Sequence, residues 1–76
     1  LDLCWTRGPR RIGVELKYTS SPAVTKSMRV AMEDLRLDQL YVVHPGEGCY
    51  PLSDRVHAAG LADMKRILYD PEAEVK

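Results

Sequence analysis

A predicted two-residue turn near the start of the chain constrains its fold more than any other feature. In Arg7-Gly8-Pro9-Arg10, Gly8 can adopt a positive φ, and Pro9 supplies the negative φ that follows it in a type II′ turn. On both sides of the turn apolar residues alternate with polar ones, at Leu1, Leu3 and Trp5 and then at Ile12, Val14, Leu16 and Tyr18. The pattern predicts a β-hairpin with one apolar face.

The same turn predicts the register of the hairpin. With Gly8-Pro9 as the loop, the opposite pairs are Arg7–Arg10, Trp5–Ile12, Leu3–Val14 and Asp2–Glu15. Lys17 follows two residues after Glu15 and therefore lies on the same face. Because directly paired residues have Cβ atoms roughly 4.5 to 5.5 Å apart, the carboxylates of Asp2 and Glu15 are expected to converge.

Two converging carboxylates repel unless one is protonated or a cation lies between them. Ligation by oxygen alone suits Mg²⁺, with Mn²⁺ as a substitute, and these ions often take phosphate oxygens as further ligands. The Lys17 ammonium could then orient a water or stabilise charge on a phosphate, which indicates phosphodiester hydrolysis. The alternative is that Asp2, Glu15 and Lys17 form a solvated polar face, with Lys17 neutralising the carboxylates.

An amphipathic helix is predicted after a loop at residues 19–22. Its apolar stripe is Met28, Ala31, Met32 and Leu35, spaced at i, i+3, i+4 and i+7. Thr25 is one candidate N-cap, and Ser21, with Pro22 at the first helical position, is another. We expect Met28 and Met32 to pack against the sheet rather than to form a partner surface.

The second half of the chain predicts one buried strand and weaker elements. Residues 40–43 form an apolar run typical of a strand covered on both faces, parallel to the strand before the helix. His44 ends this run, where it caps the strand or reaches a site. Residues 50–52 with 56–59 predict an edge strand or an irregular segment, and residues 61–70 predict a second short helix. We therefore expect one α/β (α+β) domain over residues 1–70 and a flexible tail at 71–76.

The charges balance overall but not along the chain, with eleven basic and eleven acidic residues. Residues 1–36 carry seven basic and four acidic side chains, a net charge of +3, and residues 37–76 carry the reverse, −3. Zero net charge argues against strong non-specific binding to nucleic acids. Arg7, Arg10 and Arg11 cluster at the hairpin tip, which is either a solvated turn or a contact for a phosphate backbone.

Several function classes lack their sequence signals. Cys4 and Cys49 have no zinc-ligand spacing, and neither histidine is placed near Cys4, so a Cys-His nucleophile is unsupported. No glycine-rich phosphate loop occurs, which excludes ATPase activity from these residues. No run of 18 apolar residues and no leader is present, so we expect a cytoplasmic protein without membrane contact. The missing initiator Met predicts a fragment of a longer protein or a processed product.

A resemblance to a known family rests on several segments in order. They are Asp2-Leu3, Ile12-Gly13-Val14-Glu15-Leu16-Lys17, Glu33-Asp34-Leu35, Tyr41-Val42-Val43-His44-Pro45-Gly46 and Tyr50-Pro51-Leu52. Together they resemble the uncharacterised C-terminal domain of bacterial and archaeal AAA-type ATPases, a PD-(D/E)xK nuclease-like domain. The resemblance covers residues 1 to 62 and implies a partial restriction-endonuclease-like core that lacks its leading helix.

The resemblance implies roles for individual residues. Asp2 and Glu15 would bind Mg²⁺ and Lys17 would be the catalytic lysine, so the expected activity is Mg²⁺-dependent cleavage of DNA. The alternative is a non-catalytic domain that docks on DNA through Arg7, Arg10 and Arg11, or that contacts the ATPase module of the parent chain. A further expectation is self-association, because a missing leading helix leaves sheet surface exposed.

Overall fold

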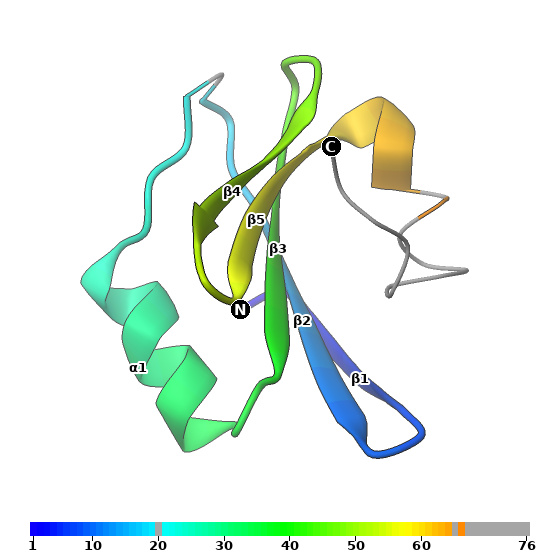
Figure 1. The fold of residues 1–76 in the computed structure, drawn as a ribbon. Helices are drawn as coiled ribbons and strands as arrows, with labels where there is room; N and C mark the ends of the chain where they lie inside the picture. The colour runs from blue at the N-terminus through cyan, green and yellow to red at the C-terminus, as the bar shows by residue number, and fades with distance from the viewer. Residues whose placement is uncertain (20, 65, 67–76) are drawn as a thin grey trace.

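The computed structural model describes residues 1–19, 21–64 and 66, which form an α+β fold. A five-stranded mixed sheet runs in the order β1-β2-β3-β5-β4, with α1 on one side of it (Figure 1). The elements are β1 (Leu3–Arg7), β2 (Arg10–Leu16), α1 (Lys26–Asp34), β3 (Gln39–His44), β4 (Cys49–Ser53), β5 (Val56–Gly60) and the 3-10 turn η1 (Leu61–Asp63).

The predicted hairpin register is confirmed over the length of β1. Arg7 pairs with Arg10, Trp5 with Ile12, and Leu3 with Val14. Gly8 has a φ of +59°, the positive value that the turn requires and that glycine adopts without steric cost. A one-residue slip would move every side chain of these strands to the opposite face, so this turn fixes which residues lie on each side of the sheet.

Helix α1 covers one face of the sheet. Its N-cap is Thr25, whose side chain accepts a hydrogen bond from the backbone N–H of Met28 at 3.2 Å, so Thr25 rather than Ser21 begins the helix. Met28 and Met32 are buried against Val42 and neighbouring apolar residues, as the core-packing prediction required. The helix then leads into β3, which pairs parallel to β2 as predicted.

The opposite face carries a second apolar cluster that is covered unevenly. Ile12, Val14 and Tyr41 are almost fully buried there, with Trp5 and Met64 packed against them. Other apolar side chains of the hairpin region, among them Leu3 and Leu16, are about half exposed. The predicted apolar face of the hairpin is therefore core at its centre and surface at its ends.

The second half of the chain contains more strand than the sequence analysis predicted. Residues 49–53 and 56–60 form an antiparallel pair, and β5 lies inside the sheet between β3 and β4, so the prediction of a single edge strand or irregular segment was wrong. The reason is that Ala58 and Ala59 are both completely buried, and a strand covered on both faces lacks the alternation that marks a half-buried strand.

The end of the chain lies mostly outside the described residues. Of the second helix predicted at 61–70, the structure describes the 3-10 turn η1 and the residues next to it, and the tail at 71–76 is not described. Across the part of the chain that is described, no helix is both long and apolar enough to cross a bilayer.

Gly60 ends β5 close to the backbone of the loop between β3 and β4, so a side chain at this position should destabilise the fold. A Cβ at this position would lie 2.8 Å from the backbone carbonyl oxygen of Gly46. We expect Gly60→Ala to lower the free energy of unfolding by about 1 to 3 kcal/mol, because backbone atoms would have to shift. Urea denaturation measures this difference, with the exposed Ser53→Ala as control; equal stability of the two variants would contradict the packing described.

Candidate functional site

Glu15 is the buried acidic residue of the described chain, and it lies on the face of the sheet that α1 covers. It pairs with Val42 of β3, a completely buried residue of the cluster beneath the helix. The Glu15 side chain is only 12% exposed. The solvated-face interpretation is therefore wrong for Glu15, whose carboxylate is largely removed from water, whereas Asp2 is exposed and Lys17 pairs with Glu15 as that interpretation expected.

Two cations approach the Glu15 carboxylate. Lys17 Nζ lies 3.2 Å from Oε2, and the α-amino group of Leu1 lies 3.3 Å from Oε1. In any longer chain the Leu1 nitrogen is an uncharged peptide N–H, so Lys17 is the cation that the sequence motif itself supplies. The Lys17 contact is an ion pair without hydrogen-bond alignment, and Glu15 Oε2 has no hydrogen-bond partner among the described residues.

Asp2 reaches the same part of β2 but contacts the backbone. Its N–H donates to the carbonyl of Val14 at 3.1 Å, and its Oδ2 accepts from the N–H of Leu16 at 2.8 Å. The carboxylate thereby takes the place of a main-chain carbonyl just beyond the last pair of the ladder. The strand ladder ends at the Leu3–Val14 pair, so the predicted pairing of Asp2 with Glu15 is not part of it. The structure brings Lys17 to the Glu15 carboxylate, whereas the Asp2 carboxylate lies on the Leu16 backbone.

This donor set fits a divalent cation that keeps most of its water shell. Glu15 Oε2 is a buried oxygen without a hydrogen-bond donor, and the carboxylate of Asp2, the residue before β1, lies on the Leu16 N–H, so the two carboxylates would have to turn toward each other to hold one ion. In the part of the chain that is described, no three His, Cys, Asp or Glu side chains form a metal-binding group. Mg²⁺ commonly binds through one or two carboxylates plus water and phosphate, which matches this count.

The three arginines at the hairpin tip differ in their surroundings. Arg7 and Arg11 are exposed, whereas Arg10 is half-buried and its Nη2 donates to Gln39 Oε1 at 2.9 Å. The backbone N–H of Arg11 donates to the Asp38 carboxylate at 2.7 Å. The exposed cationic surface predicted for this tip is therefore carried mainly by Arg7 and Arg11.

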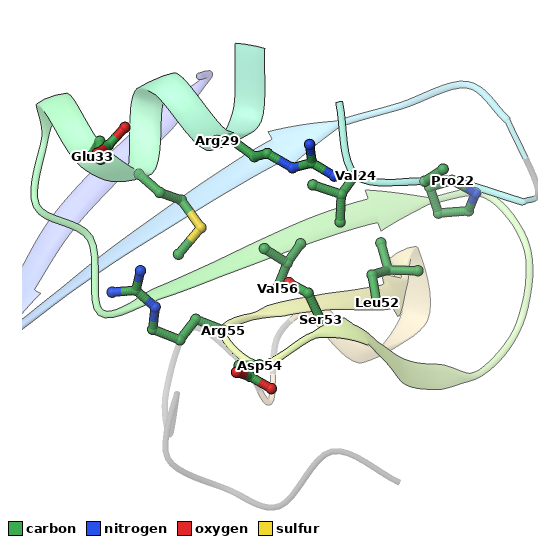
Figure 2. Close-up of a pocket in the computed structure, with 11 residues that line it drawn as sticks. Pro22, Val24, Arg29, Glu33, Leu52, Ser53, Asp54, Arg55 and Val56 are labelled. Atoms are coloured by element: carbon green, nitrogen blue, oxygen red, sulfur yellow. The ribbon is translucent and has the colours of Figure 1, made fainter. Parts of the chain in front are cut away.

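A pocket of about 800 Å³ lies away from these residues. It is bounded by α1, the segment at 22–24 and the turn between β4 and β5 (Figure 2). Arg29 extends over Val24, and Arg55 and Asp54 lie on the turn below. This pocket was not predicted from the sequence, because its walls come from segments about 30 residues apart whose packing leaves no local pattern.

The cysteines and the second histidine are not arranged for catalysis at this site. Cys4 is exposed, whereas Cys49 is buried, and burial raises the pKa of the Cys49 thiol, which disfavours the reactive thiolate. Burial lowers the pKa of His57. Its Nδ1 lies 2.8 Å from Gln39 Nε2, on the face opposite Glu15. A Cys-His nucleophile therefore has no support from the described residues.

Fold and site together define a small α+β domain with a buried carboxylate and a lysine at the end of a central strand. Two curated proteins resemble it, the uncharacterized protein Rv2008c of Mycobacterium tuberculosis and the uncharacterized protein Mb2031c of Mycobacterium bovis. Each is 48% identical over 58 residues, which cover 76% of this chain but 13% of the relative. No family model matches the chain, and the search of solved structures found no significant match.

Proposed function

We propose that this chain is a PD-(D/E)xK nuclease-like domain of the type that follows the ATPase module in AAA-type ATPases, and that it hydrolyses phosphodiester bonds of DNA with Mg²⁺. The order of its parts supports the proposal: an acidic residue, a hairpin, a Glu-x-Lys strand, a helix and a parallel strand. In this proposal β1, β2, α1 and β3 form a partial restriction-endonuclease-like core. The relatives extend far beyond the matched segment, which leaves room for an ATPase module in those proteins.

The burial of Glu15 is the observation that carries the proposal. A carboxylate on a helix-covered sheet face loses favourable hydration, and an ion pair to a partly exposed lysine recovers only part of that free energy. An oxygen in this position without a hydrogen-bond donor is suited to hold a cation. A charge kept here at such a cost is typical of functional sites.

Each residue has a separate task in the proposed reaction. Asp2 and Glu15 would hold the Mg²⁺ ion, which when bound polarises the phosphate and lowers the pKa of a coordinated water. Lys17 Nζ, released from Glu15 Oε2, would orient the attacking water or stabilise the negative charge that develops on the phosphate. The β1–β2 hairpin positions both carboxylates, because Asp2 is anchored to the Leu16 backbone.

Removing the charge of Glu15 should strongly reduce cleavage. Glu15→Gln keeps the size of the side chain but removes a metal ligand. We expect it to reduce Mg²⁺-dependent nicking of plasmid DNA by about tenfold to a hundredfold. The matched control is Glu33→Gln, the same change at an exposed position of α1. Amide spectra of both variants confirm folding, and equal cleavage by folded Glu15→Gln and wild type would contradict the proposed site.

One observation favours a second function, docking without catalysis. The carboxylates of Asp2 and Glu15 already have internal partners, so both could serve the structure alone. In that case the exposed Arg7 and Arg11 at the hairpin tip would contact a DNA backbone. An anionic surface of the ATPase module would be the corresponding partner within a longer chain.

Salt dependence of DNA binding separates docking from catalysis. If the domain docks through its hairpin tip, we expect a steep loss of affinity as salt rises, measured by fluorescence anisotropy of a labelled duplex. Arg7→Ala and Arg11→Ala should each reduce the slope of log K against log salt by about one. Asp2→Ala should not weaken binding. Unchanged slopes in both arginine variants would exclude this surface as the contact.

A further inference from the structure

His44 is a buried side chain whose hydrogen-bonding atoms the fold does not use. It is 2% exposed at the end of β3, and neither ring nitrogen has a hydrogen-bond partner among the described residues. The Tyr50 ring lies beside it, with ring centroids 5.9 Å apart. A buried polar group without a partner destabilises the fold, so its position requires an explanation other than packing.

The register of β2 and β3 brings His44 close to the carboxylate site. Glu15 pairs with Val42, and the backbone N–H of Lys17 donates to the carbonyl of Val43 at 2.8 Å. His44 follows Val42 by two residues, so its side chain lies on the same face as Glu15 and Lys17. Strands about 4.8 Å apart with a rise of about 3.3 Å per residue place the Cα atoms of Glu15 and His44 about 8 Å apart.

Two kinds of buried ligand atom without hydrogen-bond partners therefore lie on one face of the sheet. Glu15 contributes Oε2 and His44 contributes two ring nitrogens, all of them without hydrogen-bond partners in the described part of the chain. A carboxylate and an imidazole whose Cα atoms are this close can both reach a single ion. A pocket of about 130 Å³, lined by Lys17, His44 and Pro45 among others, lies at the same ends of β2 and β3.

We propose that His44 is a further ligand of the divalent cation held by Asp2 and Glu15, and that it makes the site prefer Mn²⁺ to Mg²⁺. The inference rests on the proposed metal site and adds its selectivity. Mg²⁺ takes oxygen ligands and rarely imidazole, whereas transition metals bind imidazole well. Because no group of three ligands is gathered among the described residues, binding requires the side chains of Glu15 and His44 to change rotamer while Lys17 leaves Oε2.

His57 is the internal control for this proposal. It is the other histidine of the chain, and it lies on the opposite face of the sheet with Gln39 as its partner. In a titration with substoichiometric Mn²⁺ followed by NMR, we expect the ring resonances of His44 and the amide of Glu15 to broaden first. The ring resonances of His57 should persist at the same concentration.

Each other result of the titration overturns the inference in a different way. Broadening at Glu15 but not at the His44 ring would place the ion on the carboxylates alone, so that the proposed function stands and the role of His44 fails. Equal broadening of both histidines would show non-specific contact with the ion. An unaffected spectrum would exclude a metal at this site altogether.

A pair of variants gives the same test in terms of affinity. We expect His44→Gln to weaken Mn²⁺ binding by at least about tenfold, measured by electron paramagnetic resonance of the free ion. The Mg²⁺ affinity, measured by competition with Mn²⁺, should change by less than about twofold. His57→Gln should leave both affinities unchanged. Equal Mn²⁺ affinity of folded His44→Gln and wild type would overturn the proposal. If His44→Gln does not fold, the titration of the wild-type protein decides the matter without it.

Discussion

The register of the β1–β2 hairpin determines on which face of the sheet Glu15 lies, and the candidate site depends on that choice. With Trp5 opposite Ile12, the apolar residues Ile12 and Val14 point to one face, and Glu15 points to the face that α1 covers. A register shifted by one residue would place Glu15 among the apolar residues of the other cluster and turn Val14 toward the helix. The turn at Gly8 thus controls the chemistry of a residue seven positions away.

The parallel pairing of β2 with β3 completes the site. It aligns the ends of the two strands, so that Lys17 and His44 follow Glu15 and Val42 on one face. The helix that connects the two strands covers the same face at Val42 and leaves Lys17 partly exposed. In the proposed site, Glu15 would exchange the ammonium of Lys17 for a metal ion, which the partial exposure of Lys17 allows.

Much of this arrangement could be predicted from local sequence signals. The Gly8 turn, the alternation on both sides of it and the Thr25 cap act within a few residues, and each was confirmed. The contact between Lys17 and Glu15 followed from their spacing on one strand, whereas the predicted pairing of Asp2 with Glu15 is replaced by a contact of Asp2 with the Leu16 backbone. These features depend on backbone geometry near each residue, which the sequence encodes directly.

Other features depend on contacts between distant segments and could not be predicted from the sequence. The interior position of β5 could not be read from Ala58 and Ala59, because small residues pack on both faces without a period. The burial of Glu15 was missed since charged residues on strands usually face water, and the tertiary packing that removes this one from water leaves no local sequence pattern. For His44, the strand end was evident, but the lack of partners for its ring appears only in the folded chain.

Anomalous diffraction from crystals soaked in Mn²⁺ tests the central claim most directly, because it locates the ion without any substitution. The account predicts an anomalous peak within about 2.5 Å of a Glu15 carboxylate oxygen, with Lys17 Nζ moved away from Oε2. An intact ion pair between Lys17 and Glu15, with manganese bound only elsewhere on the protein, would contradict it.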